Sequence, residues 1–438
     1  MKKIILTILG LILIVLVGVG ARYFLAYNSF LNKITERKPE MKEYSVLVFE
    51  NSELKDSSSL NGKSVGFLKT DPMFKNAEKK LTESIPVVTD SFEDINLLIE
   101  TLESGITDAM AIETNRLEIL KEESKNEAIE KMRVIYTFEI ELESEPVDVS
   151  DKEITTEPFI LYISGSDARN GINEVARSDV NIVAVVNPKQ GKILLASIPR
   201  DTYVQLHDTT GIKDKLTHAG LYGINMSKTT IEDFLNIDID YTLKVSFDTV
   251  IRVVDQLDGI DIFSDNAMTL KTEQGKVCEY IYGEQHIDGD CALRFARERK
   301  SYYTGDKHRG QNQQVVLTAI INRLSGSKDY LLKLPTILDI AADSFETSIS
   351  RDNISSFIRM QLTNPINWKV ESIAVDGTAT HEPTYSMGSN LPLYVMIPNE
   401  TSVNNVVKKI NDYLATEEEG EGTKDGEAES EKKINEDS

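Results

Sequence analysis

The chain has 438 residues, of which 40% are hydrophobic, and it carries a formal net charge of −23. This length allows two or three domains, and the apolar content is compatible with well-formed cores. The acidic balance disfavours nucleic acid, whose phosphate backbone attracts basic surfaces, so we expect no nucleic-acid partner.

An apolar run at residues 4–21 predicts a transmembrane helix near the start of the chain. Its length as a helix is roughly 27 Å, just enough to cross the hydrocarbon core of a membrane. Two lysines precede the run, which favours a cytoplasmic N-terminus at residues 1–3. We therefore expect a single-pass protein of the cell membrane whose remaining chain is extracellular. A cleavable signal peptide, with Val19-Gly20-Ala21 as its cleavage site, is the alternative.

A polar stretch rich in Lys and Glu follows at residues 22–43, and we interpret it as a juxtamembrane stalk. Residues 44–150 then predict a smaller α/β accessory domain. In this domain Ser91 and Asp94 predict the start of a helix, and its apolar stripe stops at Gly105. The order "Leu-x-Gly-Lys-x-Val-Gly", helix, "Gly-x-x-Asp-Ala" resembles one lobe of an extracellular solute-binding protein. A spacer or a protein-contact domain is the alternative interpretation.

Residues 158–415 predict a larger domain, because apolar strands alternate with helices as in layered α/β folds. The predicted strands are Phe159–Ile163, Ile182–Val186, Ile193–Ile198 and Leu243–Val245, and the predicted helices include Phe247–Leu257 and Gln311–Leu324. The final segment, residues 416–438, is acidic and almost without apolar residues, which predicts a disordered tail.

The chain holds two cysteines, Cys278 and Cys291. Outside the cell a disulfide between them is permitted, and it would brace the start of an arginine-rich segment. The residues between them, Glu279 to Asp290, are interpreted as a hairpin. Two small buried thiols are the alternative.

Two polar clusters stand out against the acidic composition. The first contains Asp167, Asp179 and Arg200, which lie where predicted strands begin or end. The second contains Arg294, Arg297, Arg299, Asp306, Arg309 and Gln313. Ligand sites of α/β sheets lie at strand ends; carboxylates suit Mg²⁺, and the planar guanidinium suits phosphate. Any one of these residues alone would be interpreted as a solvated loop charge or a cap.

The motifs around these clusters resemble those of the LytR-CpsA-Psr family. They are Arg177-Ser178-Asp179, Ser197–Val204, Lys215–Gly220, Asp255–Ile260, Ala292–Arg299 and Gly305–Gln313. The resemblance covers residues 158–330 and implies a layered α-β-α domain, and the single membrane helix is also similar to that family. It further implies a phosphotransferase that moves a glycopolymer, such as teichoic acid or capsular polysaccharide. The donor would be linked to polyprenyl pyrophosphate, and the acceptor would be peptidoglycan.

The resemblance also implies roles for individual residues. Asp167 and Asp179 match the family's paired metal aspartates, which implies Mg²⁺ or Mn²⁺ as the cofactor. Pyrophosphate binding is implied for a set drawn from both clusters: Arg200, Arg297, Arg299, Arg309, Gln313 and Lys215. The first three arginines and Asp179 are expected to act in catalysis, with Asp179 as the candidate base for the acceptor hydroxyl.

Two other functions use the same sequence features. A hydrolase would cleave polyprenyl pyrophosphates with water as the acceptor, and an extracellular sensor or scaffold would use residues 44–150 to bind a ligand or partner. Deletion of residues 44–150 is expected to spare turnover by a transferase domain. His218 and His308 are expected to be a local structural residue and a loop residue, respectively, rather than catalytic groups.

Overall fold

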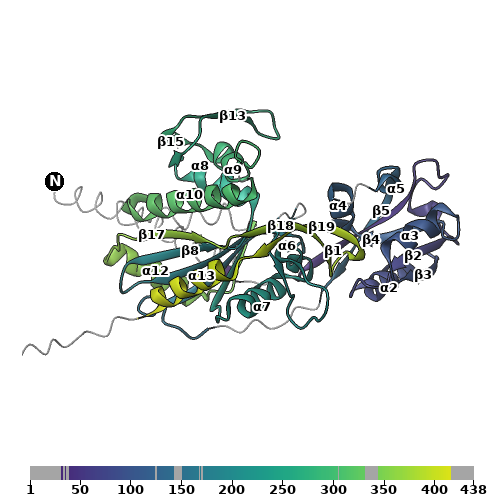
Figure 1. Cartoon of the computed structure of the whole chain (residues 1–438), viewed down its shortest axis with the longest axis horizontal. Helices are drawn as coiled ribbons and strands as arrows, with labels where there is room; N and C mark the ends of the chain where they lie inside the picture. Colours follow the sequence, from purple (N-terminus) through teal and green to yellow (C-terminus); the bar gives the residue numbers. More distant parts are fainter. Residues whose placement is uncertain are drawn as a thin grey trace, which may run out of the picture.

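The computed structural model describes residues 31, 32, 35, 39–123, 126–142, 150–166, 168, 171–303, 305–330 and 344–415. Within these ranges a smaller and a larger α/β unit lie side by side (Figure 1). No helix of the described ranges has the length and apolar character needed to cross a membrane. The predicted membrane helix, most of the predicted stalk and the predicted tail lie outside them.

The smaller unit is built on a five-stranded sheet with the order β3-β2-β4-β1-β5. Its strands are β1 (Met41–Phe49), β2 (Ser64–Leu68), β3 (Val88–Phe92), β4 (Ala109–Glu113) and β5 (Met132–Glu141). Strand β2 runs parallel to β3 and β4, whereas β1 runs antiparallel to β4 and β5. The sheet is therefore mixed, with a parallel half and an antiparallel half.

Helices connect these strands. They are the 3₁₀ turn η1 (Ser57–Leu60), α2 (Phe74–Ser84), α3 (Ile95–Glu103), α4 (Thr114–Glu123) and α5 (Glu127–Glu130). The cap of α3 is Asp94, whose carboxylate accepts hydrogen bonds from the backbone N–H groups of Asn96 and Leu97. Ser91, which we expected to begin this helix, lies in β3 instead, because the strand continues as far as Phe92. The predicted apolar stripe is buried along one face of α3.

The larger unit is built on a six-stranded sheet with the order β16-β11-β6-β7-β8-β17. Its strands are β6 (Phe159–Ser166), β7 (Ser178–Asn187), β8 (Lys192–Ser197), β11 (Tyr241–Ser246), β16 (Phe345–Thr347) and β17 (Lys369–Ala374). Four of them coincide closely with the predicted strands. They were predictable because a strand buried on both faces is a continuous apolar run.

Helices cover both faces of this sheet, which gives three layers (Figure 1). One face packs against α7 (Ile224–Leu235) and α13 (Glu400–Leu414), and the other packs against α10 (Asp306–Ser325) and α12 (Arg351–Thr363). Strand β7 shows the alternation, since Val183 lies in the first core and Ile182 in the second. Full burial of an aliphatic side chain of this size contributes about 1.5–3 kcal/mol.

A third core lies beyond α10, around α8 (Phe247–Gln256) and α9 (Gly289–Ala296). It is closed by two strand pairs, β12 (Ile260–Ser264) with β15 (Gly283–Ile287), and β13 (Met268–Lys271) with β14 (Val277–Tyr280). Residues Glu279–Asp290 are therefore not a hairpin, because β14 and β15 pair with different partners. Cys278 of β14 is bonded to Cys291 of α9, so the disulfide ties the second strand pair to the helix.

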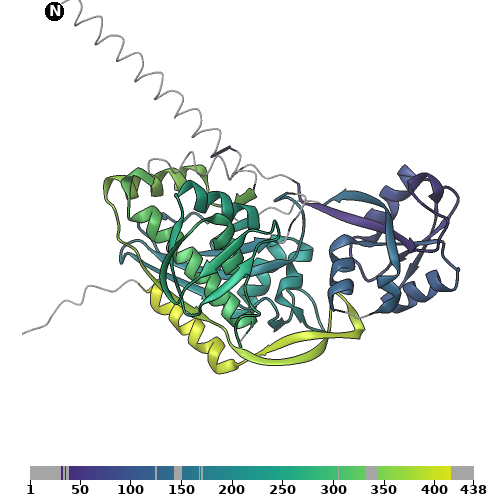
Figure 2. The ribbon, with the colours of Figure 1, turned by 90° about the horizontal axis from the view of Figure 1, so that it is seen from above.

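A long hairpin connects the two units. It consists of β18 (Gly377–Thr384) and β19 (Gly388–Pro398), and Figure 2 shows it reaching from the larger unit to the smaller one. Met387 and Leu393 of this hairpin lie in the same buried core as Leu117 of α4. Leu221 joins that core from the 3₁₀ turn η2 (Gly220–Tyr222), which follows α6 (Leu216–Ala219). The two units therefore share part of their hydrophobic interior.

Candidate active site

Asp179 and Arg200 meet where two neighbouring inner strands of the larger sheet begin and end, at the edge formed by the strand ends. Because β7 and β8 run antiparallel, the start of β7 and the end of β8 lie at the same edge. Asp179 Oδ1 accepts hydrogen bonds from Arg200 Nη1 at 3.0 Å and from Thr217 Oγ1 at 3.3 Å. The backbone N–H of Thr217 in turn donates to the carbonyl of Arg200, which fixes the two segments to each other.

Helix α10 brings the second polar cluster to the same edge. The predicted helix began at Gln311, but the observed one begins at Asp306, after Gly305 with its positive φ of 51°. Asp306 Oδ1 lies 2.5 Å from Arg309 Nη2. The helix approaches β8 closely, and a Cβ atom at Gly310 would lie 3.2 Å from Ser197 Oγ. A side chain at this position would therefore crowd the strand, and glycine allows the close approach.

A small pocket at this edge is lined by residues of both clusters. Among them are Asp179, Arg200, Asp306, Arg309 and Gln313. Arg309 and Gln313 are four residues apart on α10 and so lie on the same side of the helix. The structure thus brings five residues that the sequence singled out into one pocket.

The carboxyl groups of this pocket differ in pKa. Burial alone would raise the pKa of Asp179, but Arg200, Arg177 and Arg309 lower it below its usual value. Burial raises the pKa of Asp306, and the charge of Arg309 opposes this only in part. Asp179 is therefore held as an anion, whereas Asp306 takes up a proton more readily.

Arg200 has an unsatisfied donor. Burial alone would lower its pKa, but Asp179 and Asp201 raise it above the usual value, so it is fully charged. Its Nε is buried and makes no hydrogen bond within the described part of the chain, and Asp201 Oδ2 lies 3.7 Å from it. A buried donor without a partner is unfavourable by about 1–3 kcal/mol. Such a donor calls for an acceptor, and an anionic ligand would supply one.

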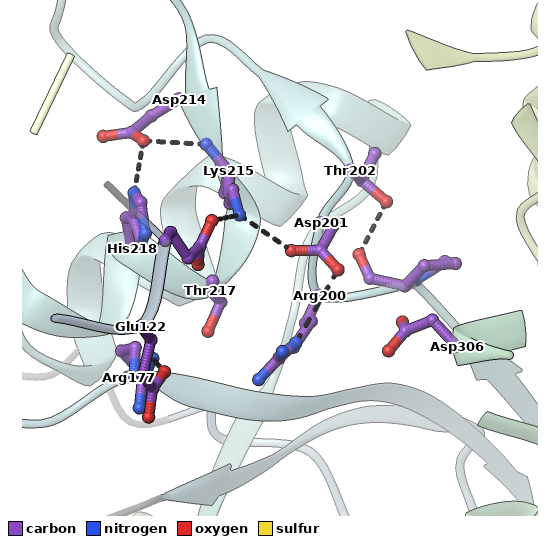
Figure 3. Close-up of polar contacts among 12 residues, drawn as sticks. Glu122, Arg177, Arg200, Asp201, Thr202, Asp214, Lys215, Thr217, His218 and Asp306 are labelled. Carbon is purple, nitrogen blue, oxygen red and sulfur yellow. Dashed lines mark hydrogen bonds and ion pairs between the residues drawn. The ribbon is translucent and has the colours of Figure 1, made fainter. Parts of the chain in front are cut away.

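Lys215 lies behind this pocket and is only 2% exposed. Its Nζ is 3.2 Å from Asp201 Oδ1 and 2.6 Å from Glu123 Oε2. Figure 3 shows Lys215, Asp201 and Arg200 following one another, with Arg177 and Glu122 nearby. Lys215 therefore faces carboxylates of the protein, and its effect on a ligand would pass through Asp201.

The remaining predicted arginines lie elsewhere. Arg297 stacks on the ring of Phe247 at 4.7 Å, pairs with Glu273 at 3.0 Å and lines a cavity of about 770 Å³ with Arg294. Arg299 is exposed in the segment after α9. The cavity also includes Ala168, next to Asp167 in sequence. Asp167 itself lies outside the described residues, so its metal role stays a prediction, as do the pyrophosphate roles of Arg297 and Arg299.

The sequence matches the LytR_cpsA_psr family over residues 119–411, which is well over half of the chain. The chain belongs to the LytR_cpsA_psr family. The match includes every segment that forms the pocket, from the start of β7 to α10.

This chain is similar to two proteins named polyisoprenyl-teichoic acid–peptidoglycan teichoic acid transferase. TagV of Bacillus subtilis is 30% identical over 279 residues, which are 62% of this chain and 68% of TagV. TagU of Halalkalibacterium halodurans is 31% identical over 270 residues, which are 58% of this chain and 82% of TagU. The crystal structure of B. subtilis TagV matches with a TM-score of 0.50 at 29% identity, over 59% of this chain and 98% of that one.

The two histidines singled out in this LytR_cpsA_psr chain both contact carboxylates of the protein. His218 is fully buried, and its Nδ1 lies 2.6 Å from Asp214 Oδ1. His308 stacks on Tyr302 with ring centroids 3.5 Å apart and lies 3.2 Å from a carboxylate oxygen of Asp265. It belongs to the first turn of α10 and not to a loop, because that helix begins earlier than predicted.

Three residues without a predicted role hold charged groups in or behind the pocket: Asp201, Thr217 and Glu123. Asp201 follows Arg200 directly and was visible in the motif, but nothing indicated that it would hold Lys215. Thr217 was likewise visible only as part of a motif. Glu123 comes from the smaller unit and lies 92 residues from Lys215 in sequence, so no local pattern could have identified it.

The described residues are compatible with a divalent cation that is held mainly by the phosphate groups of a bound substrate. Among them there is no group of three or more His, Cys, Asp or Glu side chains arranged to hold a metal ion. Mg²⁺, however, is often bound through one or two carboxylates together with substrate phosphates. Asp179, an anion at the edge of the pocket, offers one such carboxylate.

Proposed function

We propose that this protein is a membrane-anchored extracellular phosphotransferase. It moves a glycopolymer of the teichoic acid or capsular polysaccharide class from polyprenyl pyrophosphate to peptidoglycan. The observation that carries the proposal is the charged Arg200 guanidinium, whose buried Nε lacks a hydrogen-bond partner within the described residues, in a pocket with Arg309 and Gln313. A pyrophosphate oxygen is a suitable acceptor for that donor, and the names of TagV and TagU support the same chemistry.

In the proposed reaction, a hydroxyl of peptidoglycan attacks the phosphorus next to the glycan. A new P–O bond forms to the acceptor, and the bond to the bridging oxygen breaks, so that polyprenyl phosphate leaves. Phosphoryl transfer depends mostly on positioning and on neutralisation of charge. Arg200 and Arg309 would contact the pyrophosphate, and Gln313 would donate a neutral hydrogen bond from its amide.

Asp179, together with Asp167, would hold Mg²⁺ or Mn²⁺ against the pyrophosphate oxygens. When bound, the cation supplies positive charge beside the leaving phosphate. The lowered pKa of Asp179 suits this role, because a metal ligand must be ionised. The same shift makes Asp179 a weaker base than its neighbour.

We assign the base for the acceptor hydroxyl to Asp306 in place of Asp179. Burial raises the pKa of Asp306, which brings its proton affinity closer to that required of a general base near neutral pH. Asp306→Asn should therefore remove the acidic limb of the pH–rate profile, whereas loss at Asp179 should change the metal requirement. An acidic limb that persists in Asp306→Asn would return the base role to Asp179.

The test of the function uses the full-length protein in detergent with a polyprenyl-pyrophosphate-linked glycan, peptidoglycan and Mg²⁺. Release of polyprenyl phosphate together with attachment of glycan, both lost in Arg200→Ala, would support the transferase. Release without attachment would indicate a hydrolase. Neither product, with a donor accepted by a known transferase, would favour a sensor or scaffold.

A further inference from the structure

Helix α4 of the smaller unit ends beside the motif residues of the larger unit. Its last two residues are Glu122, 2.8 Å from Arg177, and Glu123, 2.6 Å from Lys215. The side chains of Arg177 and Lys215 are only 5% and 2% exposed. The smaller unit thus supplies carboxylates to buried cations of the larger one, which an independent spacer would not do.

A continuous chain of charges leads from Glu123 to the pocket. Lys215 Nζ is 3.2 Å from Asp201, Asp201 is 3.7 Å from Arg200 Nε, and Arg200 Nη1 is 3.0 Å from Asp179. Each charge in the series lies next to one of opposite sign. A change at Glu123 therefore reaches Arg200 through two intervening side chains.

Lys215 is buried, and this makes its partner Glu123 hard to replace. At 2% exposure, Lys215 has almost no access to water, so its ammonium group depends on the carboxylates of Glu123 and Asp201. Loss of one partner of a buried ion pair leaves a charge uncompensated. Without Glu123, the ammonium would be drawn fully to Asp201, and the position of Asp201 relative to Arg200 would change.

The first turn of α4 is tied to the larger unit. Asn115 Nδ2 donates to the carbonyl of Val175 at 2.8 Å, two residues before Arg177. Arg116 is fully buried, and its Nη2 donates to Tyr222 Oη at 3.2 Å and its Nη1 to the carbonyl of Ser386. These three bonds join the start of α4 to the larger unit, and the ion pairs of Glu122 and Glu123 join its end to the same unit. Glu123 therefore projects from a helix that contacts the larger unit at both ends, and a site element of this kind positions a side chain precisely.

We propose that Glu123 is a positioning residue for phosphotransfer. It fixes Arg200 through Lys215 and Asp201, and the smaller unit thereby completes the active site of the larger one. The inference rests on the proposed function for its kinetic consequence, but the positioning of Arg200 can be measured separately as affinity for pyrophosphate. Deletion of residues 44–150, which the sequence alone led us to expect to spare turnover, should therefore lower it, because Glu123 would be lost.

The experiment compares three full-length variants. Glu123→Ala removes the carboxylate, whereas Glu123→Gln keeps an oxygen that can accept from Lys215 but removes the charge. Glu127→Ala is the matched control, because this glutamate lies on α5 of the same unit, is 88% exposed and lies 3.9 Å from Lys131 Nζ. The readouts are kcat for glycan transfer per folded molecule, the affinity for inorganic pyrophosphate with Mg²⁺ by calorimetry, and the melting temperature.

Glu123→Ala should lower kcat about 10- to 100-fold and weaken pyrophosphate binding about tenfold, since small misplacements of a catalytic group have effects of this size. Glu123→Gln should recover part of both, and Glu127→Ala should match the wild type. Equal kcat and equal affinity in Glu123→Ala and Glu127→Ala would overturn the proposal. So would a loss in Glu123→Ala that only follows the fraction of unfolded protein.

The same data separate this inference from the proposed function. If the wild type transfers no glycan but Glu123→Ala still weakens pyrophosphate binding, the transferase proposal fails and the positioning role stands. If the wild type transfers glycan and Glu123→Ala changes neither readout, the transferase stands and the positioning role fails.

Discussion

The two arginine-bearing regions of the larger unit differ in burial and in pairing. At the strand-end pocket, Arg200 is 16% exposed and pairs with Asp179, which is 13% exposed. At the 770 Å³ cavity, Arg297 is 39% exposed and pairs with Glu273, which is 77% exposed. Charges interact more strongly where water is excluded, and exposed pairs contribute little. We therefore propose that the pocket acts on a bound charge and that the cavity admits and holds the donor.

The largest effect should come from Arg200. Arg200→Ala should lower kcat/KM for glycan transfer about 1000-fold, since removal of one preorganised donor to a developing charge has an effect of 10²–10³. Arg200→Lys should recover little, because lysine lacks the planar fork. Steady-state kinetics of both variants would check this. A smaller loss than that of Arg297→Ala would reverse the roles assigned to pocket and cavity.

Asp179→Asn should lower kcat about 100-fold and raise the Mg²⁺ concentration needed for half-maximal rate. The pKa of Asp179 is lowered in the folded protein, so its pairing stabilises the fold at neutral pH. That contribution is lost as the pH falls below about 4 toward the lowered folded-state value. Melting temperatures of wild type and variant should therefore converge in acid. A difference that stays constant would contradict the ion pair with Arg200.

Arg297→Ala should raise the KM for the donor about tenfold and leave kcat nearly unchanged. An interaction made equally in the ground state and the transition state changes KM alone. Donor titrations at saturating peptidoglycan would measure both parameters. If kcat falls with little change in KM, Arg297 acts on the transition state, and the division between pocket and cavity would have to be abandoned.

The smallest catalytic effect should follow removal of the Cys278–Cys291 disulfide, which lies next to the cavity wall at Lys271–Gln274. The double variant to serine should lose about 2–3 kcal/mol of stability, as expected for a short closed loop. The KM for the donor should rise about threefold, with kcat unchanged. Reduction of the wild-type protein should reproduce the result. A large fall in kcat would show that the disulfide supports the pocket rather than the cavity.

Most of the larger sheet was predictable, because its central strands are apolar on both faces and stand out as runs. The start of α10 was not, because its first turn, Asp306–Gly310, is polar and carries no apolar stripe. The helix begins there because Gly305 turns the chain and Gly310 permits close contact with β8. A stripe of apolar residues locates the middle of a helix better than its ends.

The same contrast holds for the site. Asp179, Arg200, Arg309 and Gln313 could be grouped because each lies in a motif at a strand end or a helix start. Glu123 could not, because its role depends on how α4 docks against the larger unit. Docking of this kind depends on packing between distant segments, which periodicity and spacing do not record.

The β18–β19 hairpin has a consequence for the order in which the protein folds. Chains emerge N-terminus first, and a first domain usually folds before the rest is made. Here Met387 and Leu393 complete a core shared with the smaller unit, and they are synthesised after almost all of the larger unit. The smaller unit must therefore wait with part of its apolar surface open, as a client for chaperones and proteases. A chain truncated before the hairpin would remain in that vulnerable state.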